Sequence, residues 1–567
     1  MYIRFMMQRR YLFLLLSSFF LSLYGQKNSP PLDIPLKLSG TFGEFRPSHF
    51  HAGIDIKTQG QEGLKVSAVD AGSIRRIRVS TTGYGKCLYI QHANGTTSVY
   101  AHLQKFAPKI EAFVKAYQYE NETFTLQRFL KLNEMTVEKG ELIGYSGNTG
   151  GSEGPHLHFE LRDTKAETPL NPLAHGIAVK DSIRPIVQGL YRYKLTGDRI
   201  HPKEPIPLRR ENDSVYRADM QSLGGVYGLG VRLFDRQDLS YSRNGIYKAE
   251  LFVNGSLAFA YTFDKISFED GKKINTMVDY KTYREERFRI QKLFRNNDVA
   301  FTFLPKTAPN GYINFDAGRA YQIQLVLNDF QANTTYVSFY VKGTKEPTAP
   351  LADIASLLLP ERDYLYFVDQ FEVYVPKETF YDPVAFKATN MGDTLLIKEV
   401  PFPQKKGFEI TARIPQGLDS LEHQQLCLAK INTKKTKSKK KLNYVWTTKN
   451  DSVLATKYAY PGTYVFSRDS LAPTIEPINF KPEQWMSNYN YLKLKALDDF
   501  SGIKSYRATI NGEWILMEHE PKDNTLTFNF DDRTFKKAQL NLEVEIEDFV
   551  ENKRVYTTTI FRKPKRD

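Results

Sequence analysis

The sequence predicts a mainly β protein of several domains, and three observations support this prediction. The chain has 567 residues, and at about 150 residues per domain this length allows about four domains. Short segments of alternating apolar and polar residues, separated by glycine turns, recur along the chain. Two stretches in its C-terminal part carry the same turn signals in the same order. We therefore predict an antiparallel β-sheet domain with a helical insertion, followed by about three β-sandwich-like (immunoglobulin-like) domains.

The first 25 residues predict a secretory signal peptide. Arg9 and Arg10 precede an apolar run over residues 11–23, which ends shortly before Gly25. A charged start, a short apolar middle and a small residue at the end are typical of such peptides. The run is shorter than the ~20 apolar residues of a spanning helix, although an uncleaved N-terminal anchor is the alternative. We expect export to the periplasm or cell envelope, or secretion, with no transmembrane segment in the mature chain.

The composition narrows the classes of partner and cofactor. The formal net charge is +14, and removal of the signal peptide with its three arginines would leave +11. Such an excess favours acidic surroundings such as nucleic acid, anionic lipid or a charged wall polymer, without choosing among them. The two cysteines, Cys87 and Cys427, are too few for a disulfide scaffold or a cysteine-rich zinc domain. We expect both to be small buried hydrophobic residues.

Residues 26–180 are predicted to form the first domain. Strands are expected at residues 64–69, 73–79 and 87–90, each next to a glycine turn. An insertion over about residues 104–139 breaks this pattern, because its apolar residues recur at helical spacing. These residues are Phe106, Ile110, Phe113, Val114 and Tyr117.

Residues 181–346 and 471–567 are predicted to be related β-sandwich domains. Each contains a Gly-Ile pair, then an Asn-Gly pair typical of a hairpin turn, and later Asp-Phe-x-x-Asn. The matched positions are Gly245, Asn254 and Asp329 in the first copy and Gly502, Asn511 and Asp548 in the second. Residues 347–470 are predicted to form another β-rich domain. Its lysine-rich run at 434–441 is expected to be a solvated hairpin loop, with binding of an anionic polymer as the alternative.

Histidines cluster in the first domain, where seven of the ten lie between His49 and His175. In residues 155–161 polar and apolar side chains alternate, so His156, His158 and Glu160 share one face of a strand. Gly53 argues against a helix between His51 and Asp55. We therefore place these two residues at the start of a strand, with both side chains on one side.

Two histidines and a carboxylate are three of the four ligands of a tetrahedral zinc site. No cysteine lies near these motifs to complete a closed structural site, so the pattern favours a catalytic site that leaves one position for water. Zinc lowers the pKa of bound water to about 7 and polarises the carbonyl group under attack. A lone His-x-His is more often part of a surface strand, and it is the combination of motifs that predicts a metal centre.

These motifs resemble the lysostaphin/LytM-type zinc metallopeptidases, a family of peptidoglycan endopeptidases. The resemblance covers about residues 36–175 and rests on segments 49–55, 100–103, 144–150 and 154–160, which occur in the order of the family. It implies a compact antiparallel sheet with the site in a groove, which the insertion would line or cover. It also implies the site residues: His51, Asp55 and His158 bind one Zn²⁺ per peptidase domain, and His102 and His156 are catalytic imidazoles beside it.

The resemblance implies a zinc-dependent endopeptidase that cleaves peptide bonds in peptidoglycan stem peptides or cross-links. The family also contains members that have lost ligands and activate other wall hydrolases, so a non-catalytic wall-binding regulator is the alternative. A surface adhesin would leave the histidines unexplained. We expect peptidoglycan peptides as the substrate, a cell-envelope protein as a candidate partner of the β-sandwich domains, and no nucleic-acid partner. His49, His92 and His175 are expected to be structural or surface residues.

Overall fold

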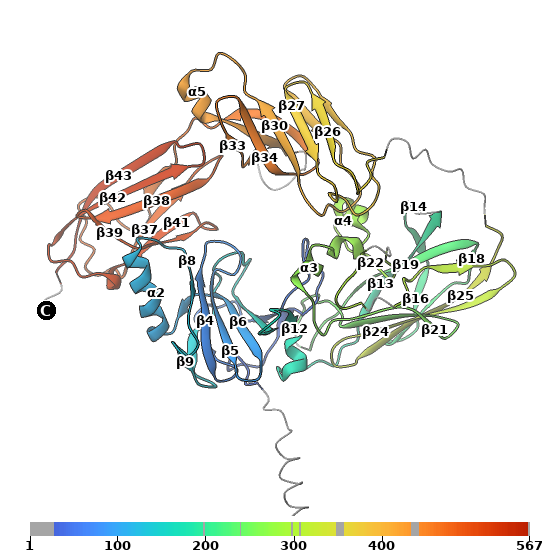
Figure 1. The fold of residues 1–567 in the computed structure, drawn as a ribbon. Helices are drawn as coiled ribbons and strands as arrows, with labels where there is room; N and C mark the ends of the chain where they lie inside the picture. The colour runs from blue at the N-terminus through green and yellow to red at the C-terminus, as the bar shows by residue number, and fades with distance from the viewer. Residues whose placement is uncertain are drawn as a thin grey trace, which may run out of the picture.

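The computed structural model describes residues 28–564 apart from residues 197–198, 239, 296–298, 305–307, 347–356 and 433–441. The predicted signal peptide and the lysine-rich run at 434–441 lie outside the described residues. Among the residues that are described, no helix is both long enough and apolar enough to span a bilayer. The fold is mainly β, as predicted, and its sheets follow one another along the chain (Figure 1).

The N-terminal unit, residues 28–180, is built on a nine-stranded antiparallel sheet. Seven strands run in the order β1-β2-β11-β6-β5-β4-β8, β12 pairs with β11, and β9 pairs with β4. A three-stranded sheet in the order β3-β10-β7 completes the unit. The bounds are β1 (Leu38–Gly40), β2 (Ile54–Lys57), β3 (Lys65–Ser67), β4 (Gly72–Val79), β5 (Lys86–His92), β6 (Thr96–Leu103), β7 (Lys105–Phe106), β8 (Leu126–Phe129), β9 (Thr136–Val137), β10 (Leu142–Tyr145), β11 (His156–Asp163) and β12 (Pro169–Leu170), with a short helix η1 (Pro172–His175) after them.

The predicted helical insertion is confirmed. Helix α2 (Pro108–Glu120) begins with proline at a position where the missing N–H costs nothing, and it buries Ile110, Val114 and Gln118 at intervals of four. After the helix, β8 and β9 pair with β4 at the edge of the large sheet. The insertion therefore extends the sheet and also places a helix beside it.

The second unit, residues 186–343, consists of two sheets. The six-stranded sheet follows the order β14-β13-β19-β22 with β15 and β23 at its sides, and the seven-stranded sheet follows β16-β17-β25-β24-β20-β21 with β18 pairing with β25. The bounds are β13 (Ile186–Thr196), β14 (Arg199–Ile200), β15 (Glu204–Ile206), β16 (Leu208–Arg210), β17 (Val215–Ala218), β18 (Gln221–Leu223), β19 (Gly225–Phe234), β20 (Lys248–Val253), β21 (Ser256–Thr262), α3 (Phe268–Gly271), η2 (Ile274–Met277), α4 (Tyr280–Glu286), β22 (Gln291–Lys292), β23 (Ile313–Phe315), β24 (Ala320–Asn328) and β25 (Thr334–Gly343). The core of this unit is continuous with the N-terminal core: the ring of Phe50 lies 5.7 Å from that of Phe263.

The third and fourth units each have two sheets around a separate core. The two sheets of the third unit have the strand orders β26-β27-β30-β34-β33 and β28-β29-β35-β31-β32. Those of the fourth unit have the orders β36-β37-β41-β40 and β39-β38-β42-β43. Bounds in the third unit are β26 (Tyr364–Val368), β27 (Phe371–Val375), β28 (Ala388–Asn390), β29 (Thr394–Ile397), β30 (Phe408–Arg413), α5 (Ser420–Gln425), β31 (Leu426–Ile431), β32 (Leu442–Val445), β33 (Thr448–Lys449), β34 (Val453–Ala459) and β35 (Gly462–Arg468). Those in the fourth are β36 (Thr474–Pro477), β37 (Tyr491–Leu497), β38 (Ile503–Ile510), β39 (Glu513–Trp514), β40 (Met517–Glu520), β41 (Thr525–Asn529), η3 (Phe530–Asp532), β42 (Gln539–Asp548) and β43 (Lys553–Phe561).

The two predicted Asn-Gly hairpins are confirmed. Asn254 and Gly255 connect β20 to β21 with φ of +49° and +80°, and Asn511 and Gly512 connect β38 to β39 with φ of +53° and +82°. Positive φ at both central residues is what the two-residue turn requires, and asparagine and glycine tolerate it best.

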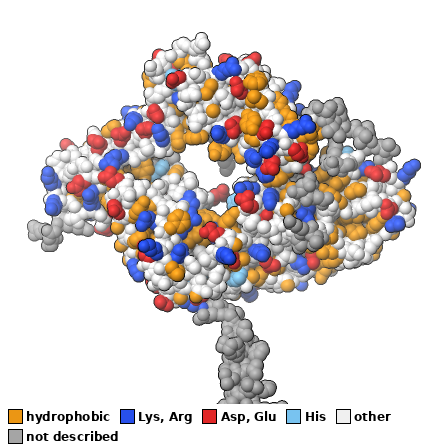
Figure 2. All heavy atoms as spheres, viewed as in Figure 1, with side chains coloured by type: hydrophobic (Ala, Val, Ile, Leu, Met, Phe, Trp, Pro, Cys, Tyr) orange, Lys and Arg blue, Asp and Glu red, His pale blue; other side chains and the backbone are white. Residues whose placement is uncertain are grey.

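The four units close into a ring, because the fourth unit returns to the insertion of the first (Figure 1). Tyr119 of α2 packs edge-on against Trp514 at 5.3 Å between ring centroids, and Lys115 pairs with Asp532. Figure 2 shows the opening that is left through the middle of the molecule. The resemblance implies that the insertion lines or covers a groove, and in the structure its helix contacts the fourth unit.

Candidate metal centre

Three neighbouring strands of the large sheet bring the predicted site residues together. Strand β11 lies between β2 and β6, and His158 on β11 is directly opposite Asp55 on β2. His102 is the next-to-last residue of β6, and His51 lies in the segment that leads into β2. The alternation predicted for β11 is confirmed, since Leu157, Phe159 and Leu161 are fully buried on the opposite face.

His51, Asp55 and His158 point three donor atoms at one position. The His51 Nε2 atom lies 3.1 Å from Asp55 Oδ1 and 3.1 Å from His158 Nδ1, and the last two atoms are 2.8 Å apart. Ligands at zinc bond lengths in a tetrahedron are separated by about 3.3 Å. The donor set and its spacing therefore fit a zinc ion.

Hydrogen bonds to the far side of each ring fix which nitrogen faces the centre. His51 Nδ1 lies 2.8 Å from the Thr41 carbonyl oxygen, so this nitrogen carries the proton and Nε2 keeps its lone pair. His158 Nε2 lies 2.8 Å from Glu160 Oε1, so in this ring it is Nδ1 that is free to bind a metal. Arg46 donates to Asp55 Oδ2 at 2.7 Å, which leaves Oδ1 directed at the centre.

Glu160 is the centre of a buried network behind His158. Its side chain is fully buried, accepts a hydrogen bond from the hydroxyl of Tyr84, and pairs with Arg162 at 2.6 Å. The Tyr84 ring also stacks on His158 with centroids 5.2 Å apart. Burial favours the neutral acid, but Arg162 and His158 outweigh it and lower the pKa of Glu160 to about 2. This carboxylate therefore stays ionised and orients the His158 ring.

His102 and His156 lie together beside the three donors. Their ring centroids are 4.8 Å apart, and His156 Nε2 is 3.5 Å from Asp55 Oδ1. His102 Nδ1 lies 2.8 Å from the Thr149 carbonyl oxygen, so its Nε2 is the proton-accepting nitrogen. Burial and the neighbouring imidazoles of His158 and His156 lower the pKa of His102 to about 3.

The loop that supports these imidazoles also contacts the fourth unit. Lys522 donates to the carbonyl oxygens of Asn148 and Ser152, on either side of the Thr149 carbonyl that holds His102. Lys86, which is 6% exposed, donates to Glu518 of the same unit at 2.9 Å. The contact that closes the ring thus includes residues adjacent to the site.

Replacing Glu160 by glutamine is expected to weaken zinc binding by about 10–100-fold, because loss of a carboxylate partner lowers the basicity and order of a ligating histidine. A competition titration of the purified protein with a zinc-selective chromophore would measure this change. Glu167→Gln, at an exposed position, is the matched control and should bind zinc as the wild type does. Unchanged affinity in a folded Glu160→Gln protein would show that this network does not position His158.

The structure keeps the other three histidines of the cluster apart from the centre. His49 and His175 are exposed, while His92 is buried and bonds the Ala71 carbonyl and the Ser98 hydroxyl. The alternation over residues 155–161 places Glu160 on the face of the two histidines but indicates no role for it. No sequence signal indicates Tyr84, and Arg46 has none beyond its closeness to His51 in the chain.

The sheet and its site define a metallopeptidase-type domain, in which one carboxylate and two histidines converge beside two further imidazoles. Residues 49–120 and 116–172 match the family described as Peptidase family M23. It is the family that the sequence motifs resemble.

Curated relatives match over a stretch of similar length. The chain is 33% identical over 124 residues to the DD-carboxypeptidase/endopeptidase Mpg of Neisseria meningitidis, which covers 22% of each protein. It is also 33% identical over 129 residues to an uncharacterized metalloprotease of Haemophilus influenzae, covering 23% of this chain and 21% of that protein. The match thus spans about a fifth of the length of each relative.

Similar solved structures include the catalytic domain of the antimicrobial peptidase lysostaphin from Staphylococcus simulans. It is 24% identical, with 27% of this chain and 91% of that chain covered and a TM-score of 0.18. A zinc containing peptidase from Vibrio cholerae is 23% identical, with 26% and 39% covered and a TM-score of 0.19.

Proposed function

We propose that this protein is a zinc-dependent endopeptidase that cleaves peptide bonds in peptidoglycan stem peptides or cross-links. The observation that carries the proposal is the convergence of His51 Nε2, Asp55 Oδ1 and His158 Nδ1 within 3.1 Å of one another. The M23 match supports the substrate class. Export to the periplasm or cell envelope is part of the proposal, because the substrate lies there.

The five residues of the site have two proposed roles, zinc binding and proton transfer. His51, Asp55 and His158 would hold one zinc ion, which supplies Lewis acidity to the scissile carbonyl and to the attacking water. His102 and His156 stand beside this position as proton carriers. An imidazole here accepts the proton of the attacking water or donates a hydrogen bond to the oxyanion of the tetrahedral intermediate.

The units behind the peptidase domain belong to the same proposal. We assign residues 181–346, 347–470 and 471–567 to separate β domains that position the peptidase domain on the wall or contact another envelope protein. Their closure into a ring that includes the N-terminal unit supports this assignment, because it joins all three domains to the peptidase domain in one assembly (Figure 1).

The test is digestion of purified peptidoglycan by the purified mature protein, followed by mass spectrometry of the released muropeptides. We expect peptide cleavage with the zinc-loaded protein, loss of cleavage with a chelator, and recovery when zinc is restored. A zinc-free protein that cuts nothing but stimulates another wall hydrolase would overturn the enzyme and favour the regulator.

A further inference from the structure

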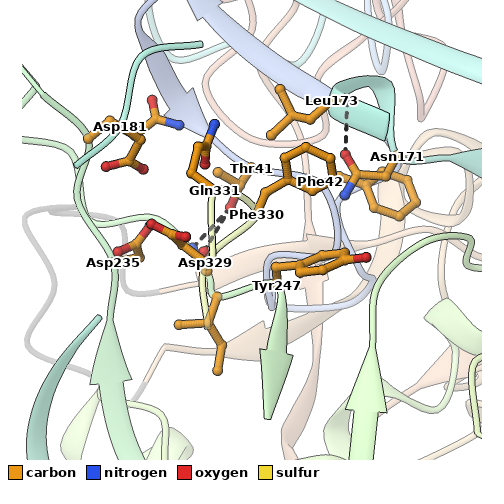
Figure 3. A pocket seen from close by; sticks show the side chains of 13 residues that line it. Thr41, Phe42, Asn171, Leu173, Asp181, Asp235, Tyr247, Asp329, Phe330 and Gln331 are labelled. Carbon is orange, nitrogen blue, oxygen red and sulfur yellow. Dashed lines mark hydrogen bonds between the residues drawn. The ribbon is translucent and has the colours of Figure 1, made fainter. Parts of the chain in front are cut away.

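A cluster of three carboxylates lies outside the peptidase centre, at the contact between the N-terminal unit and the second unit. Oxygen atoms of Asp181, Asp235 and Asp329 lie within 4.8 Å of one another. The three residues line a cavity of about 20 Å³, which is room for one water-sized particle (Figure 3). Asp235 is 2% exposed and Asp329 is 3% exposed. Asp235 and Asp329 are therefore held away from bulk solvent, while Asp181 is half-buried.

Hydrogen bonds leave part of this cluster unsatisfied. Both oxygens of Asp329 accept from Asn333, and one oxygen of Asp181 accepts from the Ile183 amide. The other oxygen of Asp181 and Oδ1 of Asp235 are buried and have no hydrogen-bond partner. Among the described residues, no lysine or arginine lies within the 4.0 Å of an ion pair with these three aspartates, and the Arg184 guanidinium acts on Asp329 only from a longer distance. A buried carboxylate oxygen without a partner is costly unless a cation binds it.

A neutral side chain next to the cluster gives an independent indication of a cation site. Asn244 pairs with Asp235 through two backbone hydrogen bonds of 2.9 Å each. Residues paired in this way have their side chains on the same face, so the Asn244 amide lies beside the Asp235 carboxylate. Asn244 is 2% exposed, and neither its oxygen nor its nitrogen has a hydrogen-bond partner. A side-chain amide oxygen is among the groups that bind hard cations.

The fourth unit repeats part of this arrangement at matching positions, although its third carboxylate, the exposed Asp499, stands where the first copy has Arg236. Asp469 begins Asp-Ser-x-x-Pro at residues 469–473, as Asp181 does at 181–185. Asp498 directly follows β37 as Asp235 follows β19, and Ser501 precedes a Gly-Ile pair as Asn244 does. Here too Asp498 Oδ2 and Ser501 Oγ are buried without partners. Oxygens of Asp469, Asp498 and Asp499 lie within 4.8 Å of one another.

The electrostatics of the first cluster agree with the geometry. Burial, together with the neighbouring aspartates, raises the pKa of Asp235 to about 9 and that of Asp181 to about 7. Three carboxylates this close cannot all be ionised without a compensating charge. A divalent cation supplies that charge.

We propose that each of the two related sandwich units binds one calcium-type divalent cation. The ligands of the first site are Asp181, Asp235, Asn244 and Asp329, and those of the second are Asp469, Asp498, Asp499 and Ser501. Ligands that are all oxygen, with carboxylates in excess, select a hard cation such as Ca²⁺. Asp181 and Asp469 each precede the first strand of their unit, so each ion fixes a connecting segment to the sandwich that follows it.

Calorimetric titration of the calcium-free, zinc-loaded full chain with CaCl₂ tests this proposal. We expect two Ca²⁺ per chain, one in Asp235→Asn, one in Asp498→Asn and none in the double variant. Ca²⁺ should raise the unfolding temperature of the wild type by several degrees, and each variant should lose part of this rise. Without Ca²⁺ the Asp→Asn variants should unfold at the same temperature as the wild type or a higher one, because the repulsion is reduced. Asp213→Asn, at an exposed position, is the control.

Asn244→Ala and Ser501→Ala provide a second measurement that leaves the charge of the clusters unchanged, and each should lower the Ca²⁺ affinity of its own site by about tenfold. The proposal is overturned if 10 mM Ca²⁺ produces neither heat nor a shift in unfolding temperature, or if both Asp→Asn variants bind Ca²⁺ as the wild type does. Affinity for Mg²⁺ equal to or above that for Ca²⁺ would overturn the assignment to calcium.

Discussion

Replacing Asp55 or His158 by alanine is expected to abolish zinc binding and peptidase activity together. Each substitution removes one of the three proposed protein ligands, and two ligands do not hold zinc at a catalytic site of this type. Asp55→Ala also leaves Arg46 without the carboxylate that it bonds at 2.7 Å. Metal content after gel filtration and release of muropeptides from purified wall measure the two effects on the same sample.

His49→Ala is the matched control, because His49 lies two residues from His51 in the sequence but is exposed and contributes no donor atom to the centre. It should retain stoichiometric zinc and wild-type turnover. Asp55→Asn keeps the shape of the side chain and separates loss of a ligand from loss of folding. Full zinc content in folded Asp55→Ala and His158→Ala proteins would contradict the assigned ligand set.

Replacing His102 is expected to leave zinc bound and to lower turnover by about 10²–10⁴-fold, the usual contribution of a general acid or base. His102 has φ of +58°, a conformation that asparagine tolerates better than most residues. His102→Asn is therefore the better variant, and His102→Ala is its companion. The effect should appear in kcat, measured on a defined peptide that carries the scissile bond.

Two measurements distinguish a proton carrier from a merely structural residue at His102. They are the zinc stoichiometry of each variant and the separate changes in its kcat and KM. A fall in kcat with zinc retained agrees with a proton carrier. Wild-type turnover in both His102 variants would reject this role for His102.

Much of the site was predictable because its motifs are local. The alternation over residues 155–161 placed His156 and His158 on one face of a strand, and the structure has this strand as β11. Gly53 correctly excluded a helix between His51 and Asp55, which lie at the entry to β2. Strand pairing then brings β2 and β11 together, and that pairing could be inferred only from the resemblance to the family.

The parts of the site and fold that the sequence did not predict depend on contacts between residues far apart in the chain. Tyr84 donates to Glu160 across 76 residues, and Lys115 meets Asp532 across 417. Periodicity reports which face of an element is apolar, but it does not report which distant side chain is opposite that face. The repeated Asp-Phe-x-x-Asn motif indicated the hairpin framework of the sandwiches, whereas the meeting of Asp329 with Asp181 and Asp235 required the tertiary structure.

Closure of the four units into a ring makes them a closed linkage in the mechanical sense. While Tyr119 stays against Trp514, a rotation at one junction requires compensating rotations at the others. The carbonyl of Thr149 that orients His102 lies between two carbonyls held by Lys522. A force applied to the fourth unit would therefore reach, through Lys522, the backbone that holds the His102 imidazole.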